Sequence, residues 1–451
     1  MSTQIESTET TIDKPDSVVI PDEHDDFSVT DRYRYFVLGM LITVGVFSWV
    51  DRQIFAVLLE SIKQEFTFSD TQLGLLGGLA FGLFYATVGL PIAWLCDKFN
   101  RRNIIVIALG LWSLMTALCG TANSFMTLFL ARMGVGVGEA GGSPPAQSMI
   151  CDYFPPERRG FALGTYFMLI PLGTLVGFLV GGWVNEFFGW RTAFMVVGIP
   201  GVVYAVFLVF MLKEPPRGHS ENRKITISPP SLLSTIKYFL SRPTLRQVPI
   251  AGAIHGIGAW GGAIWLPAYF MRTHGMSSGE VGTWFAFIFG IAGAAGTFLG
   301  GYVVDRIVKT TGDSRWYMWF SALVILVSTP FSFVVYLWPT PVPALLILII
   351  PVFIGHMFLG PVTATIQNLA GVRRRAMGAA FYLFLANMIS MGFGPLIIGM
   401  TSDFFNAEYG NDSLRYSLLT LAVITSIWAS VHFFLAARTL RQDLELANAD
   451  S

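Results

Sequence analysis

The sequence Ser69-Asp70-Thr71-Gln72 opens an apolar segment of the chain, and Ser277-Ser278-Gly279-Glu280 opens another one 208 residues later. Both have the Ser-x-x-Gln/Glu form of a capping box, in which two side chains satisfy the first free N–H groups of a helix. The same shift also superposes Asp97 on Asp305. The chain is therefore predicted to consist of two similar halves.

The composition is that of a polytopic membrane protein. Of the 451 residues, 53% are hydrophobic and 13% are charged, with a mean hydropathy of +0.59, which excludes an ordinary soluble domain. A membrane-spanning helix needs about 20 mostly apolar residues. The sequence thus predicts an all-α membrane protein with twelve transmembrane helices in two pseudo-symmetric six-helix bundles. The spans are 33–60, 71–95, 103–121, 125–150, 160–184, 192–212, 247–271, 279–304, 316–337, 342–368, 378–400 and 414–437.

The remaining segments divide the chain into domains. Residues 1–32 are acidic and lack the apolar core of a signal peptide, so we expect a disordered cytoplasmic tail. The N-terminal bundle covers 33–213 and the C-terminal bundle 247–437, joined by a polar cytoplasmic linker at 214–246. Residues 438–451 form a second cytoplasmic tail.

Basic residues are distributed unevenly over these segments. Of the 29 lysines and arginines, 23 fall on the side of the termini, two lie within spans, and four fall on the other side: Lys63, Arg191, Arg272 and Arg415. Cytoplasmic loops carry such an excess of basic residues. We therefore expect both termini in the cytoplasm, and a multi-pass protein of the bacterial inner membrane.

Glu139 and Arg132 lie seven residues apart in the apolar run 125–150. Two helical turns separate them, so both project from one helix face. A charge deep in a bilayer costs at least about 2.5 kcal/mol, and such groups usually face a cavity and serve ion or substrate movement. Asp51, in the first span, is expected at a depth between the two. We interpret the three as a proton-coupling site in which Arg132 is the only nearby cation; the alternative is a static buried salt bridge.

Two cytoplasmic loops repeat one charge pattern. Asp97 ends the second span and Asp305 the eighth, each followed by a base four residues later. An acid at a helix C-terminus opposes the macrodipole unless a cation or another helix N-terminus compensates it. Positive-inside topology explains the bases but not the repeated acids, so we expect a latch between the bundles in an outward-open state. The candidate gate residues are Asp97, Arg101, Arg158, Asp305 and Arg306.

These loops resemble the signature between the second and third helices of the major facilitator superfamily, Gly-x-x-x-Asp-Arg/Lys-x-Gly-Arg-Arg/Lys. The second copy retains Gly301 four residues before Asp305, whereas the first has Ala93 and Asn100 in place of the two glycines. The resemblance covers all twelve spans and implies a secondary transporter.

Two further stretches resemble the Spinster family of proton-linked lipid transporters. They are Val50-Asp51-Arg52-Gln53 and Arg132-Met133-Gly134-Val135-Gly136-Val137-Gly138-Glu139-Ala140, the latter followed by Pro144 and by Asp152-Tyr153-Phe154-Pro155. This resemblance implies that Asp51 and Glu139 are protonation sites. It also implies that Arg132 and Arg52 bind or gate the substrate, a lysolipid or a sphingolipid-like amphiphile.

The second half has few polar side chains within its spans. The possible cavity residues there are His255, Trp265, His356, Gln367 and Asn387. Membrane histidines can relay protons, although a lone histidine can equally bond to a neighbouring helix. A charged first half facing an apolar second half suits a substrate with one polar head and one apolar chain.

Other chemistries lack their motifs. There is no Gly-x-x-x-x-Gly-Lys-Ser/Thr loop for ATP, no nucleophile elbow and no zinc-ligand cluster. We expect no enzyme activity, cofactor, metal or nucleic-acid partner, and a monomer whose partners are the substrate, protons and the bilayer. The alternatives are an organic-anion or drug transporter of the same fold, in which Arg132 holds a carboxylate, and, from other classes, a passive lipid scramblase or a membrane-embedded lipid enzyme.

Overall fold

The computed structural model of the protein describes residues 29–218 and 232–449, which are almost entirely helical and contain no strand. The first half holds α1 (Asp31–Phe66), α2 (Asp70–Gly77), α3 (Leu79–Lys98), α4 (Arg101–Cys119), α5 (Phe125–Glu139), α6 (Ser143–Tyr153), α7 (Pro156–Tyr166) and α8 (Leu169–Met211). The second half holds α9 (Leu232–Ser241), α10 (Pro243–His274), α11 (Ser278–Phe287), η1 (Ile288–Gly293), α12 (Ala294–Thr311), α13 (Trp316–Leu337), α14 (Pro341–His356), α15 (Leu359–Asn387), η2 (Met388–Phe393), α16 (Gly394–Tyr409), η3 (Gly410–Asp412) and α17 (Ser413–Ala449).

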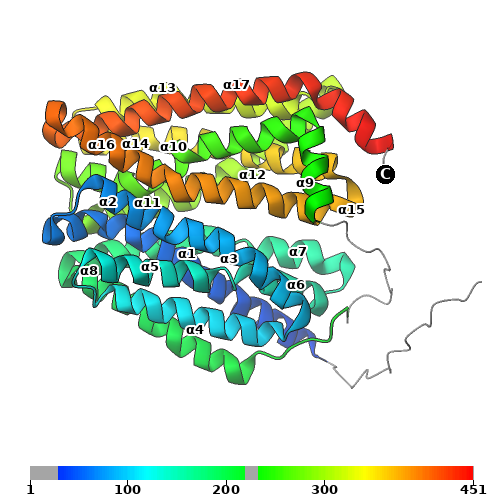
Figure 1. The fold of residues 1–451 in the computed structure, drawn as a ribbon, viewed down its shortest axis with the longest axis horizontal. Helices are drawn as coiled ribbons and strands as arrows, with labels where there is room; N and C mark the ends of the chain where they lie inside the picture. The colour runs from blue at the N-terminus through cyan, green and yellow to red at the C-terminus, as the bar shows by residue number, and fades with distance from the viewer. Residues whose placement is uncertain (1–28, 219–231, 450–451) are drawn as a thin grey trace, which may run out of the picture.

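The helices form two bundles that lie side by side (Figure 1). In this view α1 to α8 form the lower bundle and α10 to α17 the upper one. Both ends of the described chain lie at one end of the molecule, which we call the terminal end. The opposite end, where α1 is followed by α2 and α16 by α17, is called the distal end. The acidic tail predicted at 1–32 lies, up to residue 28, outside the described residues.

All twelve predicted spans coincide with helical segments. By length and apolar composition, eight helical segments of the described chain can cross a membrane, and two of them, Pro156–Met211 and Phe384–Ala447, each overlap two predicted spans. The first of these is interrupted at Gly189, whose φ of 81° favours glycine. The predicted spans 125–150 and 247–271 correspond to α5 with α6, and to α10.

The linker contains structure that the sequence did not predict. Residues 219–231 lie outside the described chain, but α9 forms a helix within the segment predicted as a polar cytoplasmic linker. The start of the linker binds the N-terminal bundle, because Glu214 accepts a hydrogen bond from Arg102 N (2.8 Å) and Arg217 donates one to Cys96 O (2.7 Å). The linker therefore begins as part of that bundle.

Two seams of close packing join the bundles in their distal halves. In the first, α2 and α3 meet η2 and α16, where a Cβ on Gly74 would lie 2.4 Å from Pro395 O and one on Gly78 2.3 Å from Gly392 O. In the second, α8 meets α11, where a Cβ on Gly282 would lie 2.3 Å from Phe178 O. Glycines permit helix backbones to approach this closely. The two bundles therefore touch backbone to backbone along both seams.

Candidate functional site

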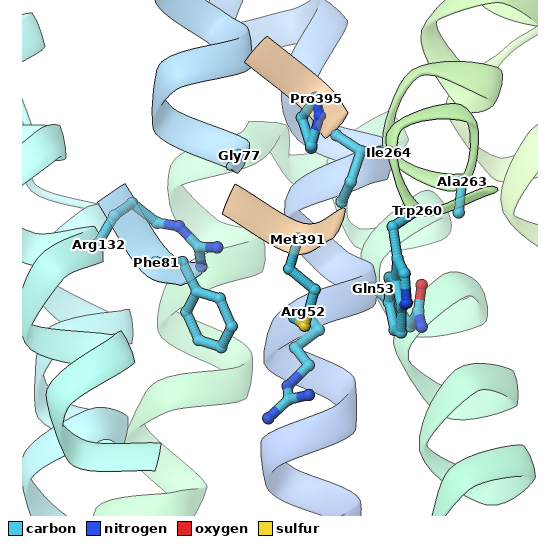
Figure 2. A pocket seen from close by; sticks show the side chains of 10 residues that line it. All are labelled: Arg52, Gln53, Gly77, Phe81, Arg132, Trp260, Ala263, Ile264, Met391 and Pro395. Atoms are coloured by element: carbon cyan, nitrogen blue, oxygen red, sulfur yellow. The ribbon is translucent and has the colours of Figure 1, made fainter. Parts of the chain in front are cut away.

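A cavity lies between the two bundles near the middle of the helices (Figure 2). Its N-terminal wall carries Arg52, Gln53, Gly77, Phe81 and Arg132, whereas its C-terminal wall consists of Trp260, Ala263, Ile264, Met391 and Pro395. The cavity is narrow in this conformation, with a volume of about 20 Å³. One wall is thus polar and cationic and the other is apolar. This is the division between the halves that the sequence indicated.

Glu139 is the centre of a buried polar cluster beside the cavity. It is the last residue of α5, and its side chain is fully buried. Its Oε2 accepts hydrogen bonds from Ser48 Oγ (2.7 Å) and from Arg52 Nε (2.9 Å), both on α1, while its Oε1 has no partner among the described residues. The charged pair therefore joins α1 to α5, with one carboxylate oxygen left over for a further ligand or a proton.

Arg52, rather than Arg132, pairs with Glu139. The expectation that Arg132 is the only cation near the acids is therefore wrong, because the side chain of Arg52 reaches the same carboxylate from α1. From sequence, the two arginines could not be ranked, since the rotation of α1 against α5 decides which guanidinium reaches Glu139. Arg52 also lies over Tyr85 (4.7 Å to the ring centroid) and Trp49 (5.2 Å).

Arg132 faces aromatic rings instead of a carboxylate. It is 3% exposed, its guanidinium lies 4.5 Å from the ring centroid of Phe55 and 5.2 Å from that of Phe81, and its Nε has no hydrogen-bond partner in the described part of the chain. Arg52 also lies 5.2 Å from Phe81, so this ring separates the two guanidinium groups (Figure 2). A buried guanidinium with unused donors on a cavity wall is suited to bind an anion.

Asp51 completes the cluster. It is 2% exposed, its Oδ1 has no partner among the described residues, and it interacts electrostatically with Glu139, Arg132 and Arg52. The structure thus brings together the three groups that the sequence singled out and adds Arg52 to them. Two acids and two bases share this site, so its net charge changes when one acid takes up a proton.

A second charged cluster closes the distal end. Arg272, at the end of α10, donates from Nη2 to Glu60 Oε2 (2.8 Å) and from Nη1 to Asp70 Oδ2 (2.9 Å), and Lys63 also binds Asp70. Arg272 belongs to the C-terminal bundle and its partners to the N-terminal one. No sequence motif marked this cluster, although the scarcity of basic residues on the distal side was a signal that could have identified Arg272.

Among the side chains that the structure describes, those of the candidate gate residues at the terminal end form no latch in this conformation. Asp305 accepts a hydrogen bond from Tyr317 (2.8 Å) within its own bundle, and Arg158 and Arg306 are exposed. The side chain of Asp97 lies outside the described residues. Because the distal end is closed, the latch expected for an outward-open state is not tested by this structure and stays a prediction.

Arg101 anchors the linker instead. It is 1% exposed and binds Asp152, Glu214 (2.7 Å), Ser148 (2.9 Å) and the carbonyl of Pro215 (2.9 Å). The buried guanidinium therefore holds the start of the linker against the N-terminal bundle.

We expect Arg101→Lys to lower the free energy of unfolding by roughly 2 kcal/mol, because an ammonium group cannot make the several hydrogen bonds that the planar guanidinium makes in this buried network. Thermal unfolding of the purified protein measures this, with Arg158→Lys as the exposed control. Equal midpoints for both variants would contradict the anchoring role.

The possible cavity residues of the second half lie elsewhere. Trp265 is fully buried and donates from Nε1 to Pro395 O (2.8 Å), and His356 Nδ1 bonds to Val352 O (2.7 Å). His255 packs against the ring of Phe358, 4.7 Å between centroids. These residues, like Gln367 and Asn387, are not on the wall of the cavity described above; Trp260 is. Helix rotation, which the sequence does not specify, determines which tryptophan of α10 faces the cavity.

Two pseudo-symmetric bundles, closed at one end around a charged cavity, define a secondary active transporter that works by alternating access. The chain belongs to the Major Facilitator Superfamily, whose family model matches residues 41–395. It is a membrane-spanning transporter and not an enzyme.

Several known transporters are similar to this chain. An MFS-type efflux pump of Mycolicibacterium smegmatis is 30% identical over 92% of this chain and 95% of its own. The hexuronate transporter of Bacillus subtilis is 26% identical over 81% and 87% of the two chains. The crystal structure of a bacterial homologue of the human lysosomal transporter Spinster, inward-facing and unoccupied, superposes with a TM-score of 0.85, 29% identity and coverage of 92% of this chain and 99% of that one. The chain is thus similar to Spinster homologues, as the sequence motifs indicated.

Proposed function

We propose that this transporter moves an amphiphile with an anionic head, a lysolipid or a sphingolipid-like molecule, in a cycle coupled to protons. The observation that carries the proposal is the division of the cavity: two guanidinium groups on one wall and only apolar or aromatic side chains on the other. An anionic head would bind Arg132 and Arg52, and an alkyl chain would lie against Trp260, Ile264 and Met391.

Proton coupling follows from the charge balance of the cluster. Asp51, Glu139, Arg52 and Arg132 are neutral as a set when all are ionised, so binding an anion leaves one negative charge uncompensated beside largely buried side chains. Such a charge is costly unless it is paired. Uptake of one proton by Asp51 or Glu139, each of which has an oxygen without a partner, restores neutrality. Anion binding and proton binding would therefore favour each other.

The membrane orientation is also part of the proposal. The excess of basic residues at the terminal end supports a cytoplasmic terminal end in the bacterial inner membrane, and hence a distal gate that is closed toward the periplasm in this conformation. In intact cells, a cysteine at Asn123 would then react with an impermeant maleimide and one at Arg158 would not. The opposite labelling pattern would show that the terminal end faces the periplasm.

We further propose that the monomer is the transporting unit.

Transport into proteoliposomes tests the substrate and the coupling together. A panel of lysophospholipids, sphingoid phosphates, short organic anions and drugs should show uptake that depends on an imposed pH gradient and grows with alkyl chain length. Preference for short anions would favour the organic-anion alternative, which the unpaired Arg132 and the hexuronate relative also support. Lipid movement indifferent to the gradient would indicate a scramblase.

Removing the anion-binding group should weaken substrate binding. We expect Arg132→Ala to raise the half-saturating substrate concentration by about 10-fold or more, the usual consequence of losing a charge-assisted hydrogen bond. Because Arg52 still faces the two acids, the variant should remain folded and should still respond to the pH gradient. Arg191→Ala, which removes an arginine that pairs with Glu65 at the distal end, is the control. An unchanged half-saturating concentration would contradict this role for Arg132.

A further inference from the structure

The first turn of α2 donates hydrogen bonds to the opposite bundle. Ser69 is its N-cap, and together with Gln72 it forms a capping box that satisfies the N–H groups of these two residues. The N–H groups of Asp70 and Thr71 remain, and both donate to Asp403 of α16, to Oδ1 at 3.0 Å and Oδ2 at 2.8 Å. All four N–H groups that a helix start leaves free are therefore satisfied, two of them by the other half.

The first turn of α11 shows the same arrangement with the halves exchanged. Ser277 is its N-cap and forms a capping box with Glu280. The N–H of Gly279, two residues after the cap, donates to Glu186 Oε2 on α8, at 2.7 Å. Here the N-terminal bundle supplies the carboxylate and the C-terminal bundle the helix, the reverse of the contact at α2.

Backbone contact on the two seams permits these bonds. A Cβ on Gly399, four residues before Asp403, would lie 2.2 Å from Asp70 O, and one on Gly279 would lie 2.5 Å from Glu186 Oε2. Ser402 and Ser278 add a hydrogen bond across each seam, to Asp70 Oδ2 (2.6 Å) and Gly182 O (3.0 Å). Any separation of the bundles at the distal end breaks both carboxylate contacts.

We propose that Asp403 and Glu186 are reciprocal helix caps that hold the distal gate closed. Each carboxylate completes the N-terminus of a helix in the opposite bundle while the gate is closed, and each helix keeps only its own serine cap when the gate is open. Each capping box satisfies only two of the free N–H groups at its helix start. The N–H groups between the two capping residues can therefore donate to a carboxylate of the other half. This role depends on alternating access and not on the proposed substrate or on proton coupling.

Spin-label distances across the distal end test the proposal without substrate. Labels at Asn123, between α4 and α5, and at Pro339, between α13 and α14, report closed and open populations in a background whose native cysteines are replaced by alanine. We expect Asp403→Ala and Glu186→Ala each to lower the closed-to-open ratio about five-fold, the typical effect of losing a helix cap. The double variant should lower it roughly 25-fold if the two caps act independently.

Glu65→Gln is the matched control. Glu65 is an acid at the same end whose partners, Trp190 and Arg191, belong to its own bundle, so its removal should leave the ratio unchanged. Asp403→Asn retains one acceptor oxygen and should produce a smaller shift than Asp403→Ala, which supplies a measurement even if the alanine variant folds poorly. Unchanged ratios in both cap variants, or an equal shift in Glu65→Gln, would overturn the proposal.

Discussion

We expect Glu139→Gln to abolish uptake driven by a pH gradient while leaving the protein folded and still able to exchange substrate across the membrane. Glutamine has the shape of glutamate, and its Oε1 can accept the hydrogen bonds that Ser48 and Arg52 now donate. It cannot bind or release a proton in the physiological range. The substitution therefore separates coupling from structure, and Asp51→Asn should behave in the same way.

Two assays on the same proteoliposomes measure this separation. Gradient-driven uptake should fall to the level of liposomes without protein, and exchange of labelled for unlabelled substrate at equal pH should persist. Glu65→Gln, outside the cavity, is expected to retain both activities. Uptake at the rate of the unmodified protein by the Glu139→Gln, Asp51→Asn double variant would show that these acids are structural and that coupling lies elsewhere.

Arg272→Ala is expected to open the distal gate. Glu60 and Asp70, whose side chains are 9% and 3% exposed, would lose the guanidinium that joins them to the other bundle. Leaving a buried charge without its partner costs about 3–5 kcal/mol, and opening the gate relieves this cost because water reaches both carboxylates. The closed-to-open ratio should therefore fall by about 100-fold or more, well beyond the effect of either helix cap.

The reactivity of a buried position reports this opening. A cysteine at Ile264, on the apolar wall of the cavity, should become accessible to an impermeant maleimide from the distal side in Arg272→Ala but not in the unmodified protein. Arg272→Lys keeps the charge with fewer donors and should give an intermediate rate. Arg415→Ala removes a distal arginine that pairs with Asp412 in its own bundle and should have no effect. Equal labelling of all four proteins would exclude Arg272 as the gate residue.

Much of the fold could be predicted because its causes are local. About 20 apolar residues are needed to cross a bilayer, so the twelve spans are visible in the sequence, and both predicted capping boxes are present at the starts of α2 and α11. The helix α9 was missed because it is amphipathic and lies within a segment of polar composition. Some span boundaries agree with the helices, as at α13 (Trp316–Leu337), but others do not: α15 (Leu359–Asn387) runs without a break from the tenth predicted span into the eleventh, and α17 continues to Ala449, beyond the predicted end at 437.

Which charges lie buried at the site could be read from local composition. Asp51, Arg132 and Glu139 lie in apolar helices. Because burying a charge in a membrane costs free energy, their presence there indicated a functional cluster. Their partners depend on contacts between helices that are far apart in the sequence. Arg52 pairs with Glu139 from 87 residues away, and the apolar wall of the cavity comes from α10, η2 and α16. The distal caps join residues 333 and 93 positions apart. Such contacts depend on how each helix is rotated and how closely two backbones approach, and these are properties of the packed bundles rather than of any one segment.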